Sequence, residues 1–178
     1  MILDKSIPKI FVCKDAYLEP LNNSHISENY LLWLKDKEVT CYTEQRFFNH
    51  DIESVKDFVR KTSQNEDELC FALIADKTHI GNFKLSNINL NHSNAVLSFL
   101  IGDKSYWGKG LASKSIRAIC EFAKMNLKLN KINASSYANN HASLRVFEKN
   151  NFRIEGKRLN DRVFEGKRID LVMVGKDL

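Results

Sequence analysis

The segment between residues 101 and 152 constrains this chain most. An apolar run, residues 95–101, stops at Gly102 and leads through Ser-Tyr-Trp into Gly108-Lys109-Gly110. Beyond the second glycine, apolar residues recur at helical spacing to about Leu129. This order predicts a strand, a glycine turn and a helix, with both glycines where the strand leads into the helix.

A second strand and a second helix are predicted directly after the first helix. Residues 131–137 have the composition of a short strand, and Asn139-Asn140-His141-Ala142-Ser143 leads into another helical pattern that ends near Phe152. Either Asn139 or Asn140 could cap that helix. The whole segment therefore reads strand, glycine turn, helix, strand, helix.

The glycine turn is suited to bind an anion. N–H groups in the first turn of a helix lack intrahelical partners, and the aligned peptide dipoles make that end positive. Gly108 and Gly110 have no Cβ, so a phosphate could approach the backbone closely, and Lys109 adds a positive charge. The pattern by itself is also compatible with an ordinary tight turn.

Two motifs together suggest a family. Tyr106-Trp107-Gly108-Lys109-Gly110-Leu111-Ala112, followed by Asn140-x-x-Ser143-x-x-x-Phe147-Glu148-Lys149-x-x-Phe152, resembles the GNAT superfamily of acetyl-coenzyme A-dependent N-acetyltransferases. Within it, the chain is most similar to the branch that contains ribosomal-protein N-terminal acetyltransferases and small-molecule (amino-sugar) acetyltransferases. The resemblance covers about Tyr17 to Val174. It implies an α/β (α+β) fold, in which helices flank a mixed, mostly antiparallel, splayed β-sheet.

The composition agrees with one domain over residues 1–178. A hydrophobic content of 43% can form a substantial core. No segment reaches the roughly 18 apolar residues of a membrane helix, and Met1–Lys5 does not begin a signal peptide. Cys13, Cys41, Cys70 and Cys120 are far apart and are expected to be reduced. We therefore expect a cytoplasmic protein with no membrane partner.

Charge is distributed unevenly along the chain. Residues 101–178 contain 16 of the 27 Lys and Arg residues but only 8 of the 22 Asp and Glu residues. A basic half suits an anionic ligand, and an acidic half suits a protonated amine, although ordinary solvated surface gives the same pattern. The basic residues are dispersed and show no interleaved aromatic stripe, so no nucleic-acid partner is expected.

The rest of the chain predicts a helical and antiparallel lead-in and a closing hairpin. The expected extended pieces and strands are residues 7–12, 17–21, 69–75, 79–87 and 95–101, followed by a hairpin of 152–155 and 163–174. The expected helices are 25–34 and a second one from its cap at Asp51 to Arg60, separated by a polar connection at 35–49.

The resemblance implies how acetyl-CoA is held. The strand before the glycine turn would hydrogen-bond the pantetheine arm, and the amides of residues 108–113 would hold the diphosphate. Relatives often carry Gln or Arg three residues before the first glycine, where this chain has Ser105, so the amides and a lysine must suffice. The expected cofactor-binding residues are Phe99, Leu100, Ile101, Gly108, Lys109, Gly110, Leu111, Ala112, Ser113, Asn140 and Lys149.

The implied reaction is transfer of an acetyl group from a thioester to a primary amine, by direct attack in a ternary complex. Many relatives protonate the departing thiolate with a Tyr in the second motif helix, where this chain has Phe147. Ser143, one turn earlier, is the replacement used in the branch that this chain resembles. A packing role is the alternative for Ser143. For Asn140, pantetheine binding and helix capping are compatible.

The general base is the least defined part of the site. Relatives place an acidic residue in the strand before the glycine turn, at positions that are Val96 and Leu97 here. Glu44, on the polar connection, is the candidate catalytic base in its place. Ser98, His79 or a backbone carbonyl acting through water are alternatives, and an already neutral amine would need no base.

The acceptor is expected to be a small amine such as a nucleotide-linked amino sugar. Trp33, Tyr42 and Arg46 lie where relatives build the acceptor wall, with core packing as the alternative for Trp33. N-terminal acetylation of a protein and a non-catalytic CoA-binding module are the alternative functions. No metal is expected, because the five histidines are scattered, and no cysteine lies in a nucleophile motif. The oligomeric state could be a monomer or a homodimer.

Overall fold

The computed structural model describes residues 7–178; the stretch Met1–Lys5 discussed above lies outside them. The strands are β1 (Ile10–Cys13), β2 (Ala16–Pro20), β3 (Leu69–Ala75), β4 (Thr78–Asn89), β5 (Asn94–Ile101), β6 (Lys131–Tyr137), β7 (Arg153–Phe164) and β8 (Lys167–Asp177). The helices are α1 (Glu28–Lys35), α2 (Lys37–Thr40), α3 (Ile52–Gln64), α4 (Leu111–Leu127) and α5 (His141–Lys149), with short 3₁₀ turns η1 (Asn23–His25), η2 (Glu44–Phe47) and η3 (Lys104–Tyr106).

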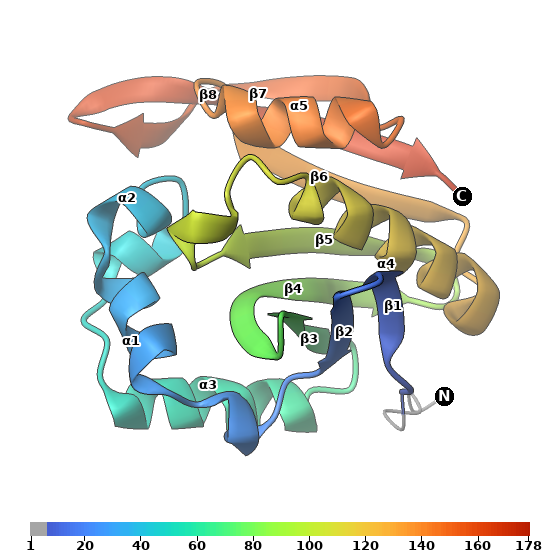
Figure 1. The fold of residues 1–178 in the computed structure, drawn as a ribbon. Coiled ribbons are helices and arrows are strands. Elements are labelled where there is room, and N and C mark those ends of the chain that lie inside the picture. Colours follow the sequence, from blue (N-terminus) through green and yellow to red (C-terminus); the bar gives the residue numbers. More distant parts are fainter. Residues whose placement is uncertain (1–6) are drawn as a thin grey trace.

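The strands form one eight-stranded sheet in the order β1-β2-β3-β4-β5-β6-β8-β7. All neighbours are antiparallel except β5 and β6, which are parallel and pair only through residues 94–96 and 131–133. Beyond these three pairs β5 and β6 are no longer paired with each other, so the sheet opens between them. The predicted mixed, mostly antiparallel sheet flanked by helices is confirmed (Figure 1).

Both faces of the sheet are covered, as β3 shows most clearly. All seven of its residues are buried, because alternate side chains point to opposite faces. Phe71 and Leu73 belong to the large core that α4 and α5 share with the sheet, whereas Cys70 and Ala72 pack with Val59 of α3 on the other face. This burial on both faces explains why the strand reads as a continuous apolar run.

Capping residues determine where the first long helices begin. The Asp51 side chain accepts a hydrogen bond from the Ser54 amide, so α3 begins where the sequence predicts. The first helix begins later than residue 25, because Asn22 caps the short turn η1 and Ser27 caps α1. The connection expected at 35–49 contains two short elements, α2 and η2.

The closing hairpin differs from the predicted one. Strand β7 continues through residues that were expected to form a polar middle, and the turn falls at Glu165 and Gly166, both with positive φ. The pairing of β7 with β8 is interrupted between Arg158 and Arg162, where β7 bulges. Because β7 is an edge strand and mostly exposed, its polar residues do not show the alternation that identifies a half-buried strand.

Two further findings concern residues 7–178. None of their helices is both long enough and apolar enough to span a lipid bilayer. All four cysteines are free thiols, with Cys70 and Cys120 buried.

Gly102, directly after β5, offers a test of the packing that joins α1 to the end of that strand. A Cβ at this position would lie 2.1 Å from Cδ2 of the buried Trp33 ring. We expect Gly102→Ala to lower the free energy of unfolding by about 3 kcal/mol, measured by urea denaturation, because a rigid buried ring cannot move aside.

Gly156→Ala is the matched control. Its added Cβ would meet only the terminal methyl of Met173, at 2.8 Å, which a flexible side chain can withdraw. A loss below about 1 kcal/mol is expected for it. Equal losses for the two variants would contradict the close fit of Gly102 against Trp33.

Candidate active site

A cavity of about 840 Å³ lies beside the opening between β5 and β6. The ends of β5 and β6 that are no longer paired with each other line it, together with α3, the segment around η2 and the β7–β8 hairpin. Residues 97–100 of β5 and 135–137 of β6 reach it, and β3, β4 and β8 contribute further lining residues. The cavity therefore begins where the parallel pairing ends.

The edge of β5 that faces the opening has no neighbouring strand beyond Val96. On its other side β5 is paired with β4 up to Ile101, so only the groups that point toward β6 are left without a ladder. Backbone groups in this position can bond an extended ligand as an added strand would. Phe99, Leu100 and Ile101, the predicted pantetheine contacts, lie on this stretch.

The glycine turn leads into α4 with the geometry that an anion site needs. Gly108 and Gly110 have φ values of 74° and 76°, and an added Cβ at either would meet no atom of residues 7–178 within 4 Å. Gly110 is the N-cap of α4 and has no side chain to cap it, so the first amides of the helix stay available. The Trp107 indole N–H donates to the Ile101 carbonyl at 2.9 Å and so ties the turn to β5.

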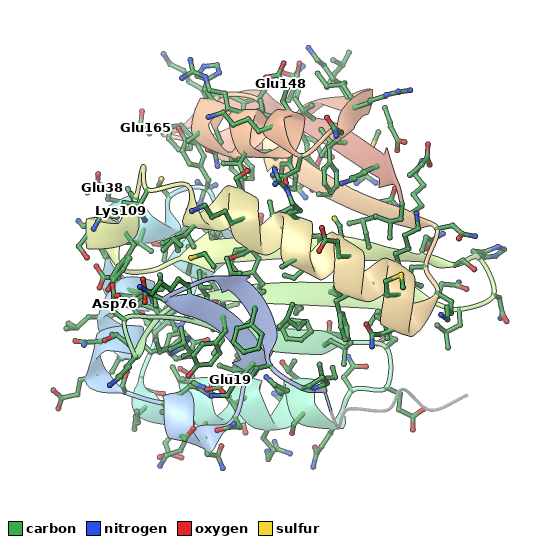
Figure 2. All side chains as sticks on the ribbon, turned by 45° about the vertical axis from the view of Figure 1, so that its right-hand side comes forward. Glu19, Glu38, Asp76, Lys109, Glu148 and Glu165 are labelled. Carbon is green, nitrogen blue, oxygen red and sulfur yellow. The ribbon has the colours of Figure 1, made fainter. Side chains whose placement is uncertain are left out.

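Lys109 stands beside this turn. Its Nζ lies 4.9 Å from the centre of the Tyr106 ring, and the side chain is exposed at the surface (Figure 2). The turn, the first turn of α4 and this charge together can hold a diphosphate group. Leu111, Ala112 and Ser113 form that first helical turn.

The second motif places its residues around the start of α5. Asn140 is the N-cap, and its side chain accepts a hydrogen bond from the Ser143 amide at 3.1 Å. Asn140 also lines the cavity, so its capping role does not exclude the predicted contact with pantetheine. Ser143 is half-buried and is not among the residues that line the cavity, while Lys149 is exposed at the far end of the helix.

Phe147 occupies the position where relatives carry a tyrosine. It is 2% exposed, lines the cavity and makes an edge-to-face contact with Phe99, with ring centres 5.7 Å apart. Its ring also packs against Phe152. These contacts form an apolar floor at the point where the two strands separate.

The segment around η2 forms one wall of the cavity. Tyr42 stacks on Phe164 of the hairpin, with ring centres 4.8 Å apart, and its hydroxyl donates to the Asn139 carbonyl at 3.3 Å. Tyr42 also lines the cavity, which agrees with its predicted place in the acceptor wall. Aromatic stacking and a long-range hydrogen bond thus join the wall to two other parts of the chain.

Arg46 is used to hold this wall. Its guanidinium donates to the Cys41 carbonyl, to the Tyr137 hydroxyl at 3.1 Å and to the Val163 carbonyl at 2.5 Å. Nη1 and Nη2 thus bond to protein groups, and Arg46 is not part of the described cavity lining, so this geometry does not support the predicted acceptor contact. The residue joins η2 to β6 and β7 instead.

Glu44, the predicted base, lies on η2 at the cavity. Its Oε1 accepts a hydrogen bond from the Tyr137 hydroxyl at 3.1 Å and lies 3.6 Å from Nε of Arg162. Burial raises the pKa of Tyr137, and the nearby Glu44 carboxylate raises it further, so this phenol stays protonated at neutral pH. Neither Tyr137 nor Arg162 was predicted from the sequence; the position of Tyr137, just before the Asn139-Asn140 motif, was the only available signal.

The remaining predicted residues lie in different surroundings. Trp33 is buried with Tyr30, Val39 and Val55 and is not part of the described cavity lining, so its packing role is the one that the structure supports. His79, an alternative base, is likewise not part of that lining. Its ring nitrogens lie within hydrogen-bonding distance of the His25 and Gly81 carbonyls and Asn82 Oδ1, and burial lowers its pKa.

Ser98, the other alternative base, lines the cavity. Among residues 7–178, no three or more His, Cys, Asp or Glu side chains are placed to hold a metal ion.

The chain belongs to the GNAT acetyltransferases: the family model described as "Acetyltransferase (GNAT) domain" matches residues 16–153. A curated relative from Bacillus licheniformis, "Uncharacterized N-acetyltransferase p20", is 26% identical over 143 residues, which are 78% of this chain and 79% of the relative. The protein is thus an N-acetyltransferase whose co-substrate is acetyl-CoA.

Solved structures share the fold. A RimL ribosomal L7/L12 alpha-N-protein acetyltransferase in complex with coenzyme A has a TM-score of 0.86 at 16% identity, covering 96% of this chain and 98% of that one. Spermidine N-acetyltransferase from Vibrio cholerae, solved with CoA and spermine, has a TM-score of 0.81 at 20% identity, covering 92% and 95%. The microcin C7 self-immunity acetyltransferase MccE, with acetyl-CoA and AMP, has a TM-score of 0.80 at 17% identity, covering 94% of each chain.

The charge beside the glycine turn gives a direct test of donor binding. We expect Lys109→Glu to weaken acetyl-CoA binding about tenfold at low ionic strength, with a smaller effect as salt is added, because an exposed charge is screened. Isothermal calorimetry measures the affinity for acetyl-CoA at low ionic strength and with added salt. Lys124→Glu makes the same charge change in the last turn of α4 and should leave the affinity unchanged; equal weakening by both variants would contradict a diphosphate at the turn.

Proposed function

We propose that the acceptor is a small primary amine, such as a nucleotide-linked amino sugar. The supporting observation is the cavity of about 840 Å³, whose volume falls in the range of small-molecule sites. Its lining combines aromatic rings, which suit the face of a sugar, with side-chain amides and hydroxyls, which suit its hydroxyl groups. The polar groups include Asn49, Ser54, Asn82 and Ser98.

The proposed donor site follows the opening from β5 to α4. The backbone of Phe99, Leu100 and Ile101 would bond the pantetheine arm, and the amides of residues 108–113 with Lys109 would hold the diphosphate. Asn140 would contact the pantetheine and Lys149 the nucleotide end. This arrangement would direct the thioester toward the cavity, over the apolar floor formed by Phe99 and Phe147.

The proposed chemistry needs two proton transfers and no covalent intermediate on the protein. Glu44 accepts a proton from the acceptor ammonium, which frees the nitrogen lone pair to attack the acetyl carbonyl carbon. As the carbon–sulfur bond breaks, Ser143 donates its hydroxyl proton to the departing sulfur and regains a proton from solvent. The second proton of the attacking nitrogen leaves to water.

We also propose a cytoplasmic location and a soluble partner. All four cysteines are free thiols, which is typical of proteins in a reducing compartment. No nucleic-acid partner is proposed, and the chain would act as a monomer or a homodimer.

An acceptor panel tests the proposed function. The wild-type protein is incubated with acetyl-CoA and, in turn, nucleotide-linked amino sugars, polyamines and short peptides with free N-termini, and release of free thiol is measured. Turnover of an amino sugar is the expected result. Turnover of peptides without sugars would overturn the proposal in favour of protein acetylation, and calorimetric binding of acetyl-CoA without any turnover would identify a non-catalytic module.

Ser143→Ala tests the proposed acid. Loss of a positioned proton donor should lower kcat about a hundredfold while the affinity for acetyl-CoA changes little. Ser86→Ala on β4 is the control, because Ser86 lies outside both sequence motifs and its hydroxyl bonds only weakly to the Val96 carbonyl, at 3.5 Å. An unchanged kcat for Ser143→Ala would remove this residue from the mechanism.

A further inference from the structure

Tyr137 is the last residue of β6 and faces the cavity. It is 4% exposed, and its neighbour across the sheet, Leu171 of β8, lines the cavity on the same face. The Tyr137 ring makes an edge-to-face contact with Tyr42, with ring centres 5.9 Å apart. Packing on several sides therefore fixes the place of its hydroxyl.

The two hydrogen bonds of this hydroxyl have a defined direction. Arg46 Nη2 lies 3.1 Å from the oxygen, and a guanidinium can only donate. The hydroxyl proton is consequently free to point at Glu44, whose Oε1 lies 3.1 Å away on the other side. Arg46 itself donates to the Val163 and Cys41 carbonyls. A series of hydrogen bonds therefore runs from the hairpin backbone through Arg46 and Tyr137 to the Glu44 carboxylate.

Glu44 depends on these neighbours for its position. Its side chain is 61% exposed, and the N-cap of η2, Thr43, makes no side-chain capping bond. Tyr137 and Arg162 both approach Oε1, which leaves Oε2 without a protein partner among residues 7–178. A carboxylate fixed through one oxygen presents the other to a ligand in the cavity.

We propose that Tyr137 is the positioning residue for Glu44, directing its carboxylate so that Oε2 takes the proton of the acceptor ammonium. This inference rests on the proposed function. One N–H bond of the ammonium breaks and one O–H bond forms at Oε2, and the nitrogen lone pair then attacks the acetyl carbon. The proton later leaves Glu44 for water, so no further reactant is required.

Removal of the hydroxyl alone tests this role. Tyr137→Phe keeps the ring and its packing but should lower kcat/KM about tenfold, since hydrogen bonds to charged groups contribute more than neutral ones. Arg162 and Arg46, the other charged groups near this carboxylate, remain in place, so the variant removes only the hydroxyl contact.

A double-mutant cycle separates this role from a general effect on folding. Glu44→Gln should cost about a hundredfold in kcat/KM, and Tyr137→Phe combined with Glu44→Gln should cost no more than Glu44→Gln alone. Tyr17→Phe on β2, which is not part of the described cavity lining, is the matched control and should leave kcat/KM unchanged. Additive losses would overturn the inference.

A second readout needs no acceptor and so separates this inference from the proposed function. The Tyr137 phenol is titrated by ¹³C NMR of labelled tyrosine in the wild type and in Glu44→Gln, with Tyr137→Phe identifying its signal. Because the negative carboxylate raises the pKa of Tyr137, that pKa should fall in Glu44→Gln. An unchanged titration would refute the contact even if acetyl transfer to amines were established. A lowered pKa in a protein that acetylates no amine would refute the proposed function and leave the contact standing.

Discussion

The short parallel pairing between β5 and β6 is the constraint on which the site depends. Three residue pairs join the two strands, and beyond them each strand stays paired only with its outer neighbour, β4 or β8. Aromatic packing keeps them apart: Phe99 of β5 stacks on Phe83 and meets the edge of Phe147 from α5. Phe83 and Phe147 are buried in the main core, and the partly buried Phe99 packs against it. Closing the opening would require moving these rings, so the backbone edge of β5 stays available to an extended ligand.

The wall of the cavity is held differently from its floor. The segment from Tyr42 to Phe48 contributes no fully buried side chain, so hydrophobic burial does little to fix it. Its order comes from directed contacts that reach far along the chain, through Arg46 to β6 and β7 and through the stacking of Tyr42 on Phe164. A wall held by polar contacts can change its surface without disturbing the core, which is the property that acceptor specificity requires.

The parts of the molecule that depend on local chemistry could be predicted from the sequence. Strand β3, the cap of α3 at Asp51 and the glycine turn into α4 all follow from residues within a few positions of each other. The hairpin was predicted with its turn in the wrong place, because an exposed edge strand shows no alternation. The bonds of Arg46 to the protein could not be predicted, because a charge on a polar connection does not reveal partners 91 and 117 residues away. Its sequence position suggested only a contact with the acceptor.

The proton-handling groups are also hard to find by motif, because their contacts join residues far apart in the sequence. Relatives are expected to carry a tyrosine on the second motif helix and an acid on the strand before the glycine turn, and this chain has Phe147 and Val96 or Leu97 there. If Glu44 is the base, the residue that takes the proton stands on the wall that also selects the acceptor. Its position is then set by Tyr137 and by the hairpin contacts of Arg46, so any change that reshapes the wall for another amine also moves the base. Acceptor choice and rate would be coupled in this enzyme, whereas a base on a core strand would keep them independent.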